Sequence, residues 1–224
     1  MERPVVAFVL ALVAGTLSGF TFYTVRLFST VQSGNVVQAG YQVAEHSDEL
    51  WKHAVIAIVC FGLGSAATAA LQNVLAGFHT DYSLPVLLFE AAVLFLLGFA
   101  FVHDRWSAMT YAYVVSFLAG MQGSAFHKVD GLLYGNVAVT MVVQFAFEHL
   151  AHAVFADRRT HLLRSAIFFL VLSGFALGGF VGAWGTRTQG QRVLWLAATL
   201  LLLVAAEGTL RRKREGGVDI PVAG

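Results

Sequence analysis

Six long stretches with almost no charged side chains dominate this sequence. They cover residues 4–25, 54–78, 84–102, 106–126, 165–185 and 193–210. A helix needs about 20 predominantly apolar residues to cross the hydrocarbon core of a bilayer. Backbone groups inside a bilayer must be hydrogen-bonded within the protein, so stretches of this kind can cross it only as helices. The sequence therefore predicts an all-α, polytopic transmembrane helix bundle.

The composition supports a membrane protein and excludes other classes. The chain is 58% hydrophobic and 12% charged, whereas a soluble domain carries about 25% charged residues. We expect the lipid bilayer as its main partner. The net charge of +1 gives no case for nucleic acid, and the single Cys60 excludes a disulfide framework. Residues 4–25 end without a small-residue cleavage site, so we interpret them as a retained helix and not as a signal peptide.

Two further segments, residues 27–44 and 131–147, also lack charge but are only partly apolar. Each follows the first apolar stretch of one half of the chain. We interpret both as broken or re-entrant helical segments, and whether they cross the membrane completely stays open.

Short sequence echoes link the two halves. Val36-Val37-Gln38 is repeated as Val142-Val143-Gln144, and Ser33-Gly34-Asn35-Val36 resembles Tyr134-Gly135-Asn136-Val137. These echoes indicate an internal two-fold repeat with halves at about 4–102 and 106–210. Transporters are commonly built from such repeats, with the binding site at the repeat interface. We expect one transmembrane domain over residues 1–210 and a basic cytoplasmic tail over residues 211–224.

Basic residues set the expected orientation in the inner (plasma) membrane. The cluster Arg211-Arg212-Lys213-Arg214 predicts a cytoplasmic C-terminus. Because the two semi-polar segments either both cross or both do not, the number of crossings is even and both termini are cytoplasmic. If both cross, Lys52 and Arg105 are cytoplasmic and Lys128 is outside. If neither crosses, these three residues change sides.

Three motifs resemble the YoaK family of small bacterial multi-spanning membrane proteins, a family of unknown function. The first runs from Phe28 through Ser33-Gly34-Asn35, the second is Ala119-Gly120-Met121-Gln122, and the third is Tyr134-Gly135. The sequence departs from the family at Gln32-Ser33, where Met-Thr is usual, at Gly123, where Asn is usual, and at Thr140-Met141, which replaces a second Thr-Gly. The resemblance covers essentially the whole chain and implies a membrane fold without an established chemistry.

Uncharged polar residues at membrane depth are the candidate binding residues. Hydrocarbon does not solvate an amide, so Asn35 and Asn136 should face protein, water or solute. We expect a helix broken near Gly34 whose end presents polar groups to a solute. The alternative is helix packing, in which small and polar residues hold helices together. The predicted substrate-binding residues are Gln32, Ser33, Gly34, Asn35, Gln38, Gln122, Tyr134, Asn136 and Gln144.

Glu90 is the one carboxylate deep inside an apolar stretch. Acids at this depth are expensive and usually functional, so Glu90 is the predicted proton-coupling residue, although it could also be held as a hydrogen-bonded neutral acid. His149 and His152 share a helix face, but a metal site needs three or four ligands, so we predict no metal and no cofactor. Gly174, Gly178 and Gly182 at four-residue spacing suggest close helix packing, within the bundle or in a homodimer.

Two functions compete at this point. The first is a transporter or channel for a small uncharged, zwitterionic or weakly acidic solute, with a polar site where the two semi-polar segments meet. The second is a non-transporting membrane scaffold or subunit whose polar residues serve helix packing. No phosphate loop, nucleophile elbow or catalytic triad is present, so we do not expect an enzyme.

Overall fold

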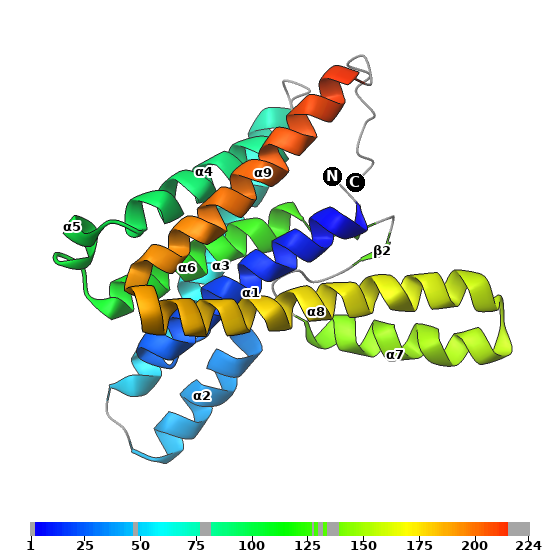
Figure 1. The fold of residues 1–224 in the computed structure, drawn as a ribbon. Helices are drawn as coiled ribbons and strands as arrows, with labels where there is room; N and C mark the ends of the chain where they lie inside the picture. The colour runs from blue at the N-terminus through cyan, green and yellow to red at the C-terminus, as the bar shows by residue number, and fades with distance from the viewer. Residues whose placement is uncertain are drawn as a thin grey trace.

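The computed structural model describes residues 3–46, 49–76, 82–126, 128–129, 132–133 and 139–214. Helices dominate, as predicted (Figure 1). In chain order the elements are α1 (Pro4–Val25), α2 (Gln32–Ala44), α3 (Leu50–Ala76), α4 (Ser83–Leu97), α5 (Ala100–His103), α6 (Ala108–Ala125), β1 (Lys128–Val129), β2 (Leu132–Leu133), α7 (Thr140–Phe155), α8 (Arg158–Gln189), the 3₁₀ turn η1 (Gly190–Arg192) and α9 (Val193–Arg214).

Three helical stretches of the described chain are long and apolar enough to cross a membrane. They are α1, α3 and the stretch Arg158–Arg211, which joins α8 to α9. Helix α4 is equally apolar but shorter. The predicted stretch 84–102 is therefore not one helix, because α4 ends at Leu97 and the short α5 follows.

Helix directions show that the two halves have opposite orientations. Helices α1 and α8 run parallel, because an added Cβ on Gly15 would meet Phe175 and one on Gly19 would meet Ala183. Helices α1 and α6 run antiparallel, since Gln122 Nε2 donates to Leu10 O at 3.1 Å near one end and Phe20 meets Tyr111 near the other. The first helices of the two halves thus cross the bundle in opposite senses.

The contacts between the two halves occur in equivalent pairs. An added Cβ on Gly64 of α3 would overlap Phe117 O of α6, and one on Gly178 of α8 would overlap Leu12 O of α1. Burial on α4 and α9 has the same spacing: Val86, Leu87, Glu90, Ala91, Leu94 and Leu97 against Val193, Leu194, Ala197, Ala198, Leu201 and Val204. The bundle is therefore an inverted repeat that pairs α1 with α6, α3 with α8 and α4 with α9.

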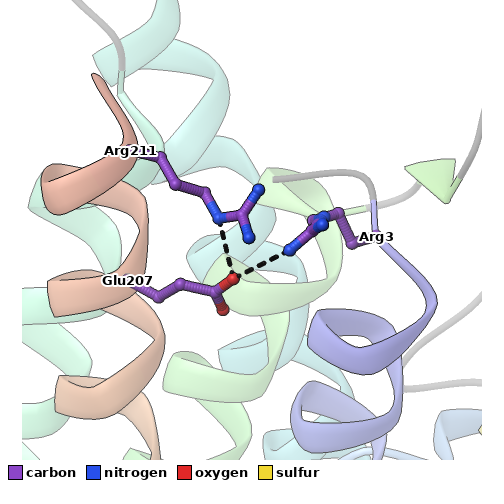
Figure 2. Close-up of polar contacts among 3 residues, drawn as sticks. All are labelled: Arg3, Glu207 and Arg211. Atoms are coloured by element: carbon purple, nitrogen blue, oxygen red, sulfur yellow. Dashed lines mark hydrogen bonds and ion pairs between the residues drawn. The ribbon is translucent and has the colours of Figure 1, made fainter. Parts of the chain in front are cut away.

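The two ends of the described chain meet at one end of the bundle. Arg3 Nη1 lies 3.2 Å from Glu207 Oε1, and Arg211 Nε donates to the same oxygen at 2.9 Å (Figure 2). Arg3 precedes α1 and Glu207 lies in the C-terminal part of α9. The start of α1 and the end of α9 therefore lie at the same end, as an even number of crossings requires.

The expected break near Gly34 is wrong, because Gly34 lies inside the first turn of α2. The break comes earlier: α1 ends at Val25, Arg26 adopts a left-handed conformation with φ of 60°, and α2 begins at Gln32. The absent Cβ of Gly34 leaves room for the Phe28 ring, whose Cδ2 would lie 2.8 Å from it. Glycine is needed here for a close approach and not for a turn.

Helix α2 does not cross the bundle. Helix α3 runs parallel to α6, since Gly120 faces Phe61 and Thr68 Oγ1 donates to Met121 O, and it is therefore antiparallel to α1. The chain leaves α1 and enters α3 at the same end, so the connection that contains α2 starts and finishes at that end. This is the arrangement in which Lys52 and Arg105 lie at the end opposite the chain termini.

The second semi-polar segment, predicted over 131–147, is not a single helix. Leu132–Leu133 pairs with Lys128–Val129 in a two-residue antiparallel ladder, and α7 begins only at Thr140. Helix α7 then folds back along α8, where Ser165 Oγ donates to Ala146 O at 2.8 Å. Figure 1 shows this α7–α8 hairpin extending away from the side of the bundle that holds α2.

Candidate functional site

The segment between α1 and α2 folds back against α1 and is buried there. Thr30 N donates to Ser18 Oγ at 3.2 Å, and Ser29 N donates to Thr21 Oγ1 at 3.2 Å. All four residues are buried. Backbone groups in an irregular segment at this depth need partners from protein or water, and here hydroxyl groups of α1 supply them. Helix α2 therefore starts inside the bundle as a re-entrant helix.

Asn35 joins the start of α2 to the preceding re-entrant segment by hydrogen bonds. Its Oδ1 accepts a hydrogen bond from Phe28 N at 3.0 Å, and its Nδ2 donates to Phe28 O at 2.6 Å and to Gln32 Oε1 at 2.8 Å. The residue is 0% exposed. The prediction that Asn35 faces inward is confirmed. Both amide hydrogens are used within the segment, so a solute would have to displace these bonds to reach the donors.

The other predicted residues of α2 differ in their surroundings. Gln32 is partly buried and donates through Nε2 to Ser29 O at 2.7 Å, whereas Ser33 is exposed. Gln38 is partly buried, and its Oε1 has no hydrogen-bond partner in the described part of the chain. The outer face of α2 carries exposed Val37 and Tyr41, a surface suited to lipid.

The described parts of the two semi-polar segments lie at different levels along α1. Helix α2 begins beside Ser18 and Thr21, near the end of α1. Val142 and Ala146 of α7 instead belong to the same apolar cluster as Ala7, near the start of α1. Gln144 of α7 is exposed, and Tyr134 and Asn136 lie outside the described residues.

Burial also identifies the counterpart of Asn35 in the second half. Asn35 is the buried residue in the first turns of α2, and Val142 takes this place in α7, directly after Thr140-Met141. The sequence echo had instead aligned Asn35 with Asn136. Asn35 therefore has an apolar counterpart in the second half.

Glu90 and Gln122 are the other predicted residues that lie deep in the bundle. Both are 0% exposed. Neither carboxyl oxygen of Glu90 has a hydrogen-bond partner among the described residues, and the same holds for Gln122 Oε1. The position on α9 that corresponds to Glu90 is the apolar Ala197. Sequence reasoning named both residues but did not connect them.

One cavity that sequence reasoning missed lies at the end of the bundle opposite the chain termini. Its volume is about 100 Å³, and its walls are mostly apolar. It is lined by Phe20, Thr24, Ala108, Tyr111, Thr186, Gly190 and Gln191. It touches neither Asn35 nor Glu90. No feature of these residues in the sequence signals a pocket, because they come from three separate parts of the chain.

Histidines gather where α7 meets α8. His149 Nδ1 lies 3.0 Å from His161 Nδ1, and His152 pairs with Glu148 at 3.7 Å. Burial, with smaller contributions from the neighbouring His161 and the Arg164 guanidinium, lowers the pKa of His149. Within the described ranges, no three or more His, Cys, Asp or Glu side chains are grouped so that they could hold a metal ion.

Comparison with known proteins gives one match. The sequence model of a family described as "Protein of unknown function (DUF1275)" matches residues 6–206. No curated protein and no solved structure matches the chain.

Proposed function

Since the chain belongs to the DUF1275 family of proteins of unknown function, we propose its function from its geometry: it is a membrane transporter or channel for a small uncharged, zwitterionic or weakly acidic solute. The resemblance to the YoaK family is compatible with this assignment and supplies no activity of its own. The proposed role is transport and not catalysis, and it requires no cofactor.

The observation that carries this proposal is the buried, unpaired carboxyl group of Glu90. It lies midway along α4, and α4 packs antiparallel to its counterpart α9, since Trp195 Nε1 donates to Phe95 O at 3.0 Å. Acids inside membrane segments are costly and usually serve proton or ion pathways. Inverted repeats with a binding site near the midplane are a common transporter architecture. Glu90 is therefore the proposed proton-coupling group.

The solute class follows from the charges of the core. Among the described residues, the buried polar side chains belong to Ser, Thr, Asn, Gln and Glu, without Lys or Arg. A polyanion would find no fixed positive charge in such a core. A neutral or zwitterionic solute avoids that cost, and a weak acid avoids it in its protonated form.

The orientation in the membrane follows from the basic residues. The end of the bundle that holds the chain termini has Arg3, Lys128, Arg158, Arg159, Arg164 and the sequence Arg211-Arg212-Lys213-Arg214. The opposite end has Arg26, Lys52, Arg105, Arg187 and Arg192. Cytoplasmic ends of membrane helices carry the excess of Lys and Arg. We therefore place both termini in the cytoplasm, with the protein in the inner membrane.

A second candidate, a membrane scaffold or subunit, is favoured by Asn35. A solute site should offer polar groups to water, whereas Asn35 is dry and bonded within its own turn. Helix packing explains this residue without a ligand. The two candidates therefore differ most clearly at Glu90, which packing alone does not explain.

The test uses the full chain reconstituted in liposomes that contain a pH-sensitive dye. A panel of small neutral, zwitterionic and weakly acidic solutes is added outside. We expect at least one solute to change the internal pH or to accumulate, and Glu90→Gln to abolish the pH change. Glu207→Gln is the matched control, because Glu207 lies in an exposed ion pair at a helix end, and it should retain the activity. A folded wild-type protein that moves none of the panel supports the scaffold.

A further inference from the structure

Among the described residues that are 0% exposed, three side-chain oxygens that act only as acceptors have no hydrogen-bond partner: Oε1 and Oε2 of Glu90 and Oε1 of Gln122. The hydroxyl groups of Ser29 and Ser116 are also buried without a partner in the described ranges. Gln122 has its Nε2 engaged with Leu10 O at 3.1 Å. This bond orients the amide and leaves its oxygen as the free end. Buried polar groups are rarely left without partners, so these three atoms need an explanation.

The register of α4 and α6 brings the two residues to neighbouring levels. Tyr111 OH donates to Leu97 O at 3.1 Å, which joins the start of α6 to the end of α4. Moving from this bond toward the end of the bundle that holds the chain termini leads along α4 to Glu90 and along α6 past Leu118 to Gln122. At 1.5 Å per residue, Gln122 lies about one helical turn, or roughly 6 Å, beyond the level of Glu90.

Both residues face the same part of the core. On α6, Tyr111, Val115, Leu118 and Gln122 are buried at helical spacing. On α4, Leu87, Glu90, Leu94 and Leu97 are buried in the same way. Leucines and Val115 from these two faces belong to one hydrophobic cluster. Glu90 and Gln122 are therefore buried among the helices that this cluster joins.

The opposite directions of the two helices turn these side chains toward each other. Side chains on a helix lean toward its N-terminus. Glu90 on α4 therefore leans toward the level of Gln122. Because α6 runs antiparallel to α4, Gln122 leans back toward the level of Glu90. Two side chains that lean toward each other in this way can be joined by a direct hydrogen bond or by a single buried water molecule, and such waters bind otherwise unsatisfied groups.

The available hydrogen-bond donors and acceptors favour one protonation state of Glu90. An ionised carboxylate would add a charge beside the Gln122 amide oxygen, and the amide donor of Gln122 is already bonded to Leu10 O. A protonated carboxyl group supplies a donor for that oxygen. We propose that Glu90 and Gln122 form a single buried proton-binding site, in which the protonated Glu90 carboxyl donates to Gln122 Oε1 directly or through one water molecule.

This site lies between the two halves of the repeat. Glu90 belongs to the first half and Gln122 to the second, and Gln122 in turn holds Leu10 O of α1. Release of the proton removes the donor of the Glu90–Gln122 pair and leaves a charge, so protonation is coupled to the contact between the halves. The use of this coupling in transport rests on the proposed function, whereas the proton site itself does not.

Infrared difference spectroscopy on the purified full chain in lipid tests the site without any solute. We expect an acid–base titration to show the carbonyl band of a protonated carboxyl group that is absent in Glu90→Gln. Gln122→Met, which keeps the side-chain length and removes the acceptor, should shift the position of this band. Gln144→Met, at an exposed position on α7, should leave it unchanged.

Each outcome decides the proposal. A folded wild type that shows no band dependent on Glu90 overturns the site, and a band that Gln122→Met does not move overturns the pairing. If Gln122→Met does not fold, Gln122→Asn keeps the amide but shortens it, and the same shift is expected. An intact band and shift in a protein that transports no solute would reject the transport function alone.

Discussion

The two halves of the bundle share their helix contacts but differ in their polar side chains. Gly64 of α3 packs against the backbone of α6 in the other half, and Gly178 of α8 repeats this contact with α1. The re-entrant helix α2, in contrast, is held by hydrogen bonds of Asn35, whereas its counterpart α7 packs Val142 against Phe168 in an apolar cluster. Glu90 likewise has an apolar residue, Ala197, at the equivalent position of the second half.

This difference distinguishes two groups of residues. One group holds the helix arrangement that both halves share, which we call the frame, and the other gives the first half its own polar groups. Contacts between backbones tolerate no added atom, so the glycines that allow them must be present in both halves. Polar groups in the core are costly unless they are paired or used, and they are present mainly in the first half. The asymmetry therefore indicates that the specific properties of this protein reside in α2 and α4 and at their contacts with α1 and α6.

The largest expected effect comes from replacing the glycines that contact the backbone of a neighbouring helix. In Gly64→Ala and Gly178→Ala, the new Cβ would overlap a backbone oxygen of the neighbouring helix, and the two helices must separate. Overpacking of this kind costs about 3 kcal/mol or more where backbone has to move. Because the contact is repeated, both variants should lose a similar amount of thermal stability, measured by the melting temperature of the purified protein in detergent.

The same two helices supply controls for these variants. An added Cβ at Gly62 of α3 or Gly179 of α8 meets no atom within 4 Å. Gly62→Ala and Gly179→Ala should therefore be neutral or slightly stabilising, because alanine favours helix. If only one of the two contact glycines proves sensitive, the frame is not shared between the halves.

A smaller effect is expected at the polar turn of the first half. Asn35→Leu removes three hydrogen bonds, which leaves Phe28 N without its partner and leaves Phe28 O with only the 3.4 Å bond from Gln32 Nε2. An unsatisfied buried group costs about 1–3 kcal/mol, so this variant should expose α2 to hydrogen exchange while the frame stays folded. Ser33→Ala, at an exposed position on the same helix, should have little effect. Unchanged protection of α2 with lost solute binding would instead make Asn35 a binding residue.

The sequence predicted the helices well and their ends less well. Apolar length identified α1, α3, α8 and α9, because burial in lipid depends on composition. The same signal could not place the end of α4 at Leu97. An added Cβ on Gly98 would overlap the Trp195 indole, and this contact joins residues that lie far apart in the chain. Helix ends that depend on such partners cannot be found from local composition.

The candidate site shows the same limit. An amide within an apolar segment predicted that Asn35 is buried, and this is correct. The sequence could not show that its bonds return to Phe28 within the same turn, because a solute and a backbone group satisfy an amide equally well. It also paired Asn35 with Asn136 because Gly-Asn-Val occurs at both places. The burial patterns of α2 and α7 instead give Val142 as the counterpart of Asn35.

The smallest expected effect concerns pH and the α7–α8 contact of the second half. Burial and the neighbouring His161 and Arg164 lower the pKa of His149 in the folded protein, while a detached α7 would have the ordinary value of about 6.5. Above that value the ring is neutral in both states and the contact keeps its full stability. As the pH falls through 6.5 toward the lowered value, the detached state binds the proton first, so the contact weakens.

Hydrogen exchange of α7, corrected for the intrinsic rate, should therefore become faster in mildly acidic buffer than at neutral pH. His149→Gln should remove this dependence, since its side chain does not titrate. Helix α2, held by uncharged groups, is the reference within the same molecule, and an equal response of α2 and α7 to acid would show that the His149–His161 contact is not the cause.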